Sequence, residues 1–597
     1  MEEVRQALAD ILMELGFQKR HIENFEITTE QLGINSLNLL RISMYLNEKF
    51  GTSVKLRRRS KNSLQDICNQ VIQEISAKSN EETEDDRFKE FNIASYLLEQ
   101  CNLRKGREAK TAVYFHNQSY TYGMIYEKVN QTAHYLLERG VHRGERIGIY
   151  MYSSPEFIYL FLGAIKAGII PVLINMKMTG EEVKKIIEIA ELTLLFSDTR
   201  LQSNLAELTE EEQKKVMMHI DEKIAHMPKE FKAVTTNKED DAFIIFTSGS
   251  SGVPKGVVHK QGTVLVCEEI SEKIISETVE KDLFYSASQL AYAYALGTSF
   301  FLPFIAGASV VLHDDDEANE VLDIIRTYSI TRFFAVPSVF QYLTWLIPDG
   351  ENPFESCRFC LASGEALPNK IAQIWKERFH VNIYQAYGMT ETLFTVILSS
   401  EHENRDGSLG KPAKGCKVRI LDDCNEELGC NAVGNIVIEA DCVFKRYWGN
   451  KQLTQSVKKD KLFITGDKGY RDEEGFIWYI GRQKDVFKIN GNWQSVIPIE
   501  EEILNHEMVL EAAAALEVCE EGESVITAYV VAKEVVDYEK LTEQIKEQFI
   551  LNGKLSVIPK KWLYVSDIPK GVTGKINRAN LHQAKVIYNY RSKEDER

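Results

Sequence analysis

The chain has 597 residues, 44% of them hydrophobic, and this length predicts several domains, each with its own apolar core. Its 88 acidic residues outnumber its 71 basic residues and give a formal charge of -17 at pH 7. This balance argues against a nucleic-acid-binding protein and against attachment to a membrane by charge, because both need a basic surface.

The N-terminus of the chain predicts a cytoplasmic protein. Met1 is followed by two acidic residues and an amphipathic pattern, whereas a secretory signal has a basic start and an apolar stretch. The uncharged run from Leu283 to Leu312 is long enough to cross a bilayer, but its glycines, proline and polar residues favour a buried segment at a pocket wall. The ten cysteines are expected to stay reduced, and Cys357 and Cys360 lack the further ligands that a zinc site needs.

The first eighty residues predict a small helical bundle. Apolar residues from Val4 to Leu15 repeat at helical spacing and stop at Gly16, which suits the end of a helix. A second helix is expected from Ser36 to Phe50, and a last one is expected to begin with Ser63 and Asp66 as a reciprocal capping pair. We interpret residues 1–78 as a four-helix domain.

The composition then becomes polar and acidic, and residues 79–87 are interpreted as a linker. From Phe88 onward, short apolar runs alternate with helical patterns, which predicts an α/β architecture. The expected strands are Arg146–Tyr150, Ile169–Ile174, Leu192–Phe196 and Ala242–Phe246.

The segment from Thr247 to Gly256 follows the last of these runs and reads Thr-Ser-Gly-Ser-Ser-Gly-Val-Pro-Lys-Gly. Glycines let backbone N–H groups approach phosphate oxygens, the hydroxyls add donors, and Lys255 adds a positive charge. The spacing differs from that of a Walker loop. The segment therefore predicts a phosphate-binding loop, with a flexible linker as the alternative.

This loop and the motifs that follow it resemble the adenylate-forming superfamily of acyl-CoA synthetases, peptide-synthetase adenylation domains and luciferases. The resemblance extends from Phe88 to Arg597 and implies ATP and Mg²⁺ as cofactors. In the motif beginning at Tyr387, the tyrosine would stack on adenine and Glu391 would help to hold Mg²⁺. The nucleotide-binding residues that the resemblance implies are Thr247, Ser248, Gly249, Ser250, Ser251, Gly252, Lys255, Tyr387, Gly388, Thr390, Glu391, Asp467, Arg482 and Lys575.

The resemblance also implies a mobile C-terminal subdomain. Asp467 would accept hydrogen bonds from the ribose hydroxyls with help from Arg482, and Lys484 would be a hinge between a large subdomain, residues 88–483, and a small α+β one, residues 484–597. Rotation at this hinge would exchange two faces of the small subdomain over one active site. Pro498 stands where the family usually has a glutamate.

Four residues are expected to take part in catalysis: Lys575, Thr247, Glu391 and Lys488. Lys575 matches the family lysine of the first half-reaction, where its ammonium group would stabilise charge that develops at the α-phosphorus and on pyrophosphate. Lys488 matches a lysine that would act after the rotation. A surface lysine in a glycine-rich loop is the alternative interpretation of Lys575.

The segment from Ser288 to Gly297 contains no acidic residue that could pair with the ammonium group of an α-amino acid. This segment is most similar to benzoate-CoA ligases, which implies a flat aryl acid as the substrate. The predicted acid pocket consists of Ala293, Tyr294, Gly364 and Phe394, with ordinary core packing as the alternative.

Ser36 follows Gly33-Ile34-Asn35, a pattern that resembles the phosphopantetheine site of acyl and peptidyl carrier proteins. A phosphodiester on Ser36 would lie at the positive end of a helix. The resemblance implies 4′-phosphopantetheine as a third cofactor and a phosphopantetheinyl transferase as a partner. Asn35 departs from the aspartate usual in fatty-acid carriers, and a plain helix cap is the alternative role of Ser36.

These patterns together predict an AMP-forming acid–thiol ligase. It would make an aryl-AMP, transfer the acyl group to the thiol on its own carrier domain, and supply downstream polyketide or peptide synthases. The first alternative is a free-standing aryl acid:CoA ligase with an accessory carrier domain. The second is a non-catalytic carrier and docking module.

Overall fold

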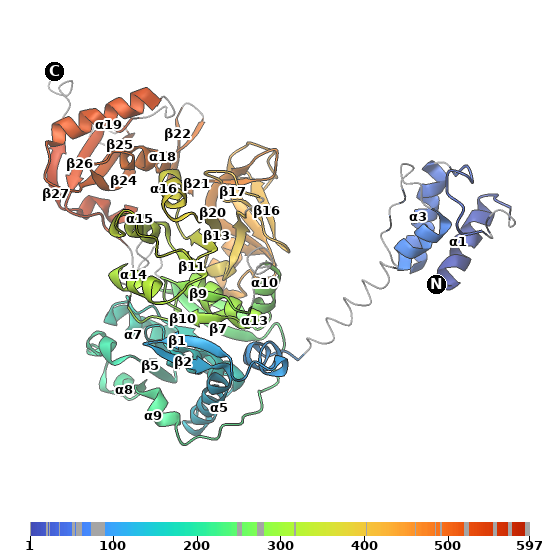
Figure 1. Cartoon of the computed structure of the whole chain (residues 1–597), viewed down its shortest axis with the longest axis horizontal. Helices are drawn as coiled ribbons and strands as arrows, with labels where there is room; N and C mark the ends of the chain where they lie inside the picture. The colour runs from blue at the N-terminus through green and yellow to red at the C-terminus, as the bar shows by residue number, and fades with distance from the viewer. Residues whose placement is uncertain are drawn as a thin grey trace. The chain divides into compact units, whose positions relative to one another are not determined.

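The computed structural model of the chain describes residues 2–18, 22, 24–34, 36–50, 54, 56, 63–72, 90–247, 253–270, 280–315, 318–400, 403–459, 461–483, 485–489, 492–518, 524–552, 558–570 and 576–590. The chain divides into two compact units, Met1–Glu90 and Phe91–Arg597 (Figure 1). The predicted linker, residues 79–87, lies outside the described residues.

The first unit is helical, with α1 (Glu2–Glu14), α3 (Ser36–Phe50) and a further helix at residues 64–72. Gly16 ends the first of these with a φ of 90°, as expected for a glycine at a helix end. The predicted capping pair is confirmed, because the Ser63 N–H donates to Asp66 and the Asp66 N–H donates to the Ser63 hydroxyl, at 2.8 and 3.1 Å. Three helices longer than one turn are visible in the described part of this unit, and a four-helix bundle stays a prediction.

The core of the first unit is built from one face of each helix. Its fully buried members include Leu8 and Leu12, then Ile42 and Leu46, and Ile67 from the last helix. This spacing of three or four residues is the helical repeat on which the sequence prediction depended.

A nine-stranded sheet forms the centre of the second unit. In spatial order its strands are β15 (Lys411–Pro412), β14 (Thr395–Leu398), β13 (Ile383–Gly388), β12 (Phe359–Ser363), β11 (Arg332–Ala335), β9 (Leu283–Ser286), β10 (Ser309–Val311), β1 (Thr111–Phe115) and β2 (Gln118–Thr121). The six strands from β13 to β1 are parallel, so their carboxyl ends lie at one edge.

A second large sheet has seven strands. In order they are β18 (Arg446–Tyr447), β8 (Lys255–Lys260), β7 (Asp241–Thr247), β4 (Ile170–Leu173), β3 (Arg146–Tyr150), β5 (Leu194–Ser197) and β6 (Val216–Met217). The strands from β7 to β6 are parallel, and β8 runs antiparallel to β7. The four strands predicted from the sequence all lie in this sheet, with ends shifted by at most two residues.

Helices follow most of the parallel strands. Those of the second unit, in chain order, are η1 (Ser95–Gln100), η2 (Leu103–Lys105), α5 (Tyr122–Glu138), α6 (Pro155–Lys166), α7 (Gly180–Ile189), η3 (Thr199–Leu205), α8 (Glu210–Gln213), α9 (Ile220–Ile224), α10 (Thr263–Ile270), α12 (Ala293–Ala295), η4 (Leu296–Phe301), α13 (Leu302–Ala306), α14 (Ala318–Thr327), α15 (Pro337–Leu346), α16 (Asn369–Phe379), η5 (Thr390–Thr392), α17 (Lys451–Val457), α18 (Ile497–Leu504), α19 (Tyr538–Asn552) and η6 (Arg578–Gln583). In the nine-stranded sheet, Phe333 packs with Phe340 of α15 and Trp375 of α16 in one apolar cluster.

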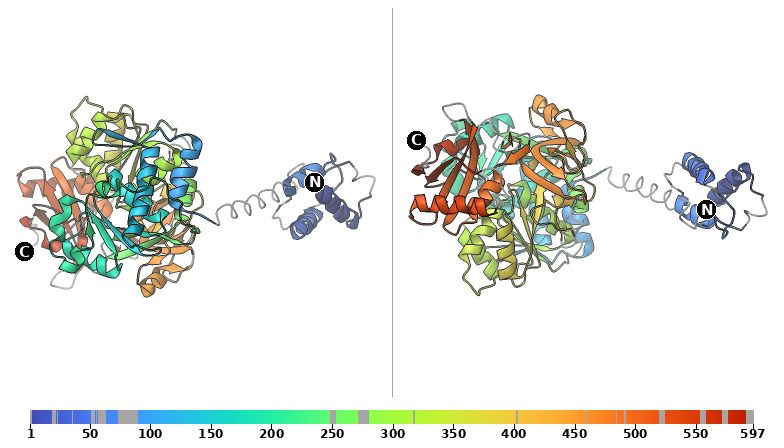
Figure 2. Two further views of the ribbon diagram at one scale, coloured as in Figure 1. Left: turned by 90° about the horizontal axis from the view of Figure 1, so that it is seen from below. Right: turned by 90° about the horizontal axis from the view of Figure 1, so that it is seen from above.

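Three further groups of strands are present among the described residues of the unit. One is a five-stranded sheet of β16 (Lys417–Leu421), β17 (Gly434–Glu439), β20 (Leu462–Arg471), β19 (Lys458–Lys459) and β21 (Ile477–Arg482). Another is the pair of β22 (Val486–Ile489) and β23 (Asn492–Ser495). A four-stranded sheet consists of β24 (Val509–Val518), β25 (Ser524–Ala532), β26 (Lys561–Val565) and β27 (Val586–Tyr590). It packs with α18 and α19 around Trp562. Figure 2 shows these last elements as a red lobe from two further directions.

The uncharged stretch from Leu283 to Leu312 is buried in the second unit, as expected. It forms β9, α12, the π-helical η4, α13 and β10, and Phe300, Phe301 and Leu302 have no exposed surface. Among the described residues, no helix is both long and apolar enough to span a membrane. Cys360 lies buried in β12 with its sulfur 3.7 Å from that of Cys357, and the described cysteines are free thiols.

The capping pair at residues 63 and 66 yields a prediction for the first unit. A Ser63→Ala change removes the side-chain acceptor of the Asp66 N–H, and such caps contribute about 1 kcal/mol. Amide hydrogen exchange across residues 64–72 of the full chain should become about fivefold faster. A Glu30→Ala change at an exposed turn serves as the control. An unchanged exchange rate in the Ser63 variant would show that the cap does not stabilise this helix.

Candidate functional site

Three of the predicted nucleotide-binding residues meet in one cluster. Tyr387, near the end of β13, donates its hydroxyl hydrogen to the Asp467 carboxylate. Arg482 lies opposite Asp467 in the β20–β21 pair, with its Nε 3.0 Å from Oδ1 of Asp467. Burial raises the pKa of Tyr387 well above its ordinary value, so the phenol stays protonated and remains a donor.

The backbone around Asp467 is fixed by its neighbours. The Thr465 hydroxyl donates to the Ile436 carbonyl at 2.8 Å and accepts from the Asp467 N–H at 3.1 Å. Gly466, between them, has a φ of 76°, which a glycine adopts without strain. The carboxylate is only 2% exposed, whereas the Arg482 side chain is 47% exposed. The cluster is thus a buried carboxylate with a partly exposed cation beside it.

Glu391 lies in η5, four residues beyond Tyr387. Its Oε1 accepts from the Tyr447 hydroxyl at 2.7 Å, and its backbone carbonyl accepts from the Phe444 N–H at 2.7 Å. Tyr447 belongs to β18, which pairs with β8 at Val257. The turn that holds Glu391 is therefore attached to the seven-stranded sheet.

His259, on the neighbouring strand β8, also attaches this turn. It is fully buried in β8, its ring stacks on Phe243, and its Nε2 lies 2.8 Å from the Thr390 carbonyl. Burial lowers the pKa of His259 to about 4. The imidazole is therefore neutral near pH 7, and with its proton on Nε2 it donates to Thr390.

Thr247 and Lys255 lie directly opposite each other, at the end of β7 and the start of β8. The predicted phosphate loop therefore connects the two strands of an antiparallel hairpin. Its residues 248–252 lie outside the described residues. Gly256, the next residue in β8, accepts a backbone hydrogen bond from Trp448, so the base of this hairpin lies beside the strand that holds Tyr447.

Glu391, the predicted magnesium ligand, places one carboxylate at the turn η5. Among the described residues, no three His, Cys, Asp or Glu side chains gather closely enough to hold a metal ion by themselves. Mg²⁺ is commonly held by one or two carboxylates together with substrate phosphates and water. Glu391 offers a carboxylate of this kind, and the Tyr447 hydroxyl orients it. The donor set fits an ion that arrives with a nucleotide.

The four predicted acid-pocket residues belong to adjoining segments. Ala293 and Tyr294 begin α12, and the Tyr294 hydroxyl donates to the Leu361 carbonyl of β12 at 2.7 Å. Gly364 follows that strand with a φ of 97°. Phe394 lies against Gly297, one helical turn after Ala293, because a Cβ built on that glycine would come within 2.5 Å of the Phe394 ring.

The remaining predicted residues are described only in part. Lys484 and Lys575 lie outside the described residues. Lys488 lies in β22 opposite Trp493, and Ser36 is the first residue of α3, but their side chains are not described. Pro498 occupies the first turn of α18, where a proline costs no helical hydrogen bond.

Sequence reasoning missed Tyr447 and His259. The apolar run Val257-Val258-His259 indicates a strand, and alternation within it could place the imidazole inside. The sequence does not indicate the hydrogen-bond partner of this imidazole, because Thr390 is 131 positions away. Arg446-Tyr447 is too short a strand to stand out in the sequence.

Comparison with known proteins decides the family. The model of the family described as AMP-binding enzyme matches residues 99–448. The chain belongs to this family. The 4-hydroxybenzoate–CoA/benzoate–CoA ligase of Rhodopseudomonas palustris is 27% identical to this chain over 518 residues, which cover 83% of this chain and 94% of the relative. The benzoate–CoA ligase of Thauera aromatica is 28% identical over 515 residues, which cover 83% of this chain and 96% of the relative.

Solved structures agree with this assignment. The benzoate CoA ligase from Burkholderia xenovorans LB400 superimposes with a TM-score of 0.75 at 27% identity, covering 82% of this AMP-binding enzyme and 99% of that chain. The anthranilate CoA ligase AuaEII in complex with anthranoyl-AMP gives a TM-score of 0.77 at 25% identity, covering 83% of this chain and 97% of that chain. The large α/β part and the small C-terminal part predicted from the sequence are confirmed.

The buried histidine yields a pH prediction. Because folding lowers the pKa of His259 from 6.5 to about 4, the unfolded chain binds the proton more readily. The contribution of His259 to the free energy of unfolding is therefore fully present above pH 6.5. It falls by up to about 3 kcal/mol as the pH falls toward 4. A His259→Gln variant can still donate to Thr390 without titrating.

The measurement is thermal unfolding of the second unit between pH 7 and pH 4.5. The His259→Gln variant should lose less stability over this range than the parent, and a variant of the exposed His226 should match the parent. Parallel curves for the parent and the His259 variant would contradict this assignment.

Proposed function

We propose that this AMP-binding enzyme joins an aryl carboxylic acid to coenzyme A in two steps. The acid and ATP give aryl-AMP and pyrophosphate, and the thiol of coenzyme A then displaces AMP to give the aryl thioester. One observation supports this most: a family member similar to benzoate and anthranilate CoA ligases holds Tyr387, Asp467 and Arg482 in one cluster, through a hydrogen bond and an ion pair.

The nucleotide would bind beside that cluster. Tyr387 would contact adenine through its ring, because its hydroxyl is already bound to Asp467. A carboxylate has about four acceptor sites, so Asp467 can receive ribose hydroxyls besides Tyr387 and Arg482. The exposed guanidinium of Arg482 lies where a phosphate or hydroxyl oxygen can reach it.

In the first step, a carboxylate oxygen of the acid would attack the α-phosphorus, and pyrophosphate would leave with the electron pair of the broken P–O bond. Thr247 lies at the base of the phosphate loop, and Glu391 would orient the magnesium ion that accompanies ATP, whose charge offsets that of the phosphates. Lys575 would stabilise the negative charge that grows in the transition state.

The acid would bind among Ala293, Tyr294, Gly364 and Phe394. The Tyr294 hydroxyl is committed to the Leu361 carbonyl, so Tyr294 offers an aromatic surface rather than a free polar group. Phe394 packs on Gly297, where a larger residue would displace its ring. Aromatic walls next to small residues suit a flat ring better than a flexible chain.

In the second step, the thiol sulfur would attack the acyl carbon, the bond to the phosphate oxygen of AMP would break, and the thiol proton would leave to solvent. Lys488 would guide this step after a rotation at Lys484. These two roles rest on the resemblance.

A second candidate acceptor is a phosphopantetheine thiol on Ser36. The observation that favours it is a separate helical unit in which Ser36 is the first residue of α3, since a helix start favours a phosphate group. A phosphopantetheinyl transferase and a downstream polyketide or peptide synthase would then be partners. The comparisons support coenzyme A better than this self-loading prediction, because the similar proteins named above are CoA ligases. They give no support to a non-catalytic module.

The acceptor is tested with ATP, coenzyme A and a panel of benzoate, hydroxybenzoates, aminobenzoates, cinnamates and short alkyl acids. Pyrophosphate exchange identifies the acid, and aryl-CoA formation is then compared between the parent and a Ser36→Ala variant. Our proposal predicts rates equal within roughly twofold, with Ser203→Ala as a surface control. Loss of all thioester formation in the Ser36 variant would contradict coenzyme A as the acceptor and favour self-loading.

The role of Tyr447 gives a further prediction. A Tyr447→Phe change removes the donor that orients Glu391 and should raise the Mg²⁺ concentration for half-maximal pyrophosphate exchange about fivefold. Calorimetry should also show a smaller gain in ATP affinity on addition of Mg²⁺. The exposed Tyr342, changed to Phe, is the matched control. An unaltered Mg²⁺ dependence in the Tyr447 variant would show that Glu391 needs no such support.

A further inference from the structure

A buried glutamine joins loops of the two large sheets. Gln289 follows β9 and is 1% exposed. Its Oε1 accepts from the Ser153 N–H, which follows β3, at 2.7 Å. Its Nε2 donates to the carbonyls of His313 and Asp315, which follow β10, at 3.3 and 3.2 Å. One carboxamide thus satisfies backbone groups from both sheets.

Ser153 strengthens this junction. Its hydroxyl accepts from the Leu290 N–H at 2.8 Å, and Ser153 is 2% exposed. The turn after β9 is therefore bound twice to the turn after β3, through the side chain of Gln289 and through the backbone of Leu290. Buried polar groups of this kind are costly to leave unpaired, so the junction has one favourable arrangement.

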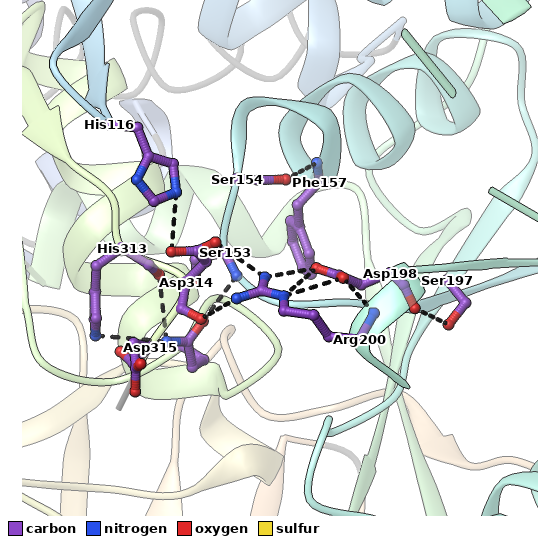
Figure 3. Close-up of polar contacts among 11 residues, drawn as sticks. His116, Ser153, Ser154, Phe157, Ser197, Asp198, Arg200, His313, Asp314 and Asp315 are labelled. Carbon is purple, nitrogen blue, oxygen red and sulfur yellow. Dashed lines mark hydrogen bonds and ion pairs between the residues drawn. The ribbon is translucent and has the colours of Figure 1, made fainter. Parts of the chain in front are cut away.

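A group of charged side chains lies at the segment that carries His313 and Asp315, and we call it the ionic layer (Figure 3). Arg200 lies between Asp198 and Asp314, at 2.6 and 3.0 Å, and donates to the Asp314 carbonyl at 2.9 Å. Its guanidinium also covers the Tyr152 ring at 4.3 Å. His116 contacts the same Asp314 carboxylate at 3.1 Å. These contacts fix the segment whose carbonyls accept from Gln289.

The junction lies directly before two of the predicted acid-pocket residues. The Tyr292 N–H donates to the Gln289 carbonyl at 3.0 Å, which closes the turn that leads into α12. Ala293 and Tyr294 are the first residues of that helix. A displacement of Gln289 would therefore move both of them together.

We propose that Gln289 is a positioning residue that sets the place of Ala293 and Tyr294, and with it the fit of the aryl acid. This inference rests on the proposed function. Gln289 is separate from the nucleotide cluster, which is built from β13, β20 and β21. Its loss should therefore weaken binding of the acid and leave binding of ATP unchanged.

The test is a Gln289→Glu change, which keeps the size of the side chain. The carboxylate can still accept from Ser153 but faces the carbonyls of His313 and Asp315 without a proton to donate. In pyrophosphate exchange, KM for benzoate, or for the best acid of the panel, should rise about tenfold while KM for ATP stays within about twofold. A purely structural role would lower the amount of active enzyme and leave both KM values unchanged.

Gln261 provides a matched control, because it is 2% exposed and accepts from the Ile93 N–H, which belongs to none of the acid-pocket segments. A Gln261→Glu variant should keep the parental ratio of the two KM values. An unchanged KM for the acid in folded Gln289→Glu would overturn the proposal. A parent that activates no acid of the panel would instead overturn the proposed function.

A second variant decides the matter if Gln289→Glu does not fold. Arg200→Gln removes the ionic layer, whose arginine is 46% exposed, and leaves the buried junction in place. Exposed ion pairs contribute little free energy to holding a segment in place. KM for the acid should therefore rise only about two- to threefold, again without a change in KM for ATP. Equal KM values for the acid in this variant and the parent would overturn the proposal.

Discussion

The proposed site depends on the contacts of one buried carboxylate, that of Asp467. It binds Tyr387, which lies 80 positions earlier in the chain, and Arg482 on the neighbouring strand. A buried charge of this kind is stable only with partners, so the end of β13 must stay beside β20 and β21. The same contact leaves the guanidinium of Arg482 partly exposed, beside the residues that we propose bind the nucleotide.

Elsewhere in the second unit, two buried polar side chains each bind the backbone of a segment that belongs to the other large sheet. His259 binds the Thr390 carbonyl, and Gln289 binds the backbone of Ser153. Parallel strands bring their carboxyl ends to one edge, where ligands commonly bind in such folds. The contacts of His259 and Gln289 hold the turns after β13 and β9 against the other large sheet, so the residues that we propose contact ATP and the acid are held in place before either ligand binds.

The sequence was sufficient for features that depend on neighbouring residues. Strand β3, the capping pair at Ser63 and the burial of the run from Leu283 to Leu312 follow from local patterns, and the structure confirms them. The roles of Tyr447 and Gln289 could not be foreseen, since their partners are 56 and 136 positions away and no local pattern encodes them. The nucleotide motifs were recognisable only because the resemblance supplied their spatial context.

The most direct test compares ATP with 2′-deoxy-ATP and 3′-deoxy-ATP in pyrophosphate exchange, for the parent and for Asp467→Asn. Charge-assisted hydrogen bonds are about twice as strong as neutral ones, so the parent should prefer ATP strongly and the variant should lose about tenfold of that preference. Our account predicts this loss for a carboxylate that receives the ribose. A variant that discriminates against the deoxynucleotides as well as its parent would contradict it.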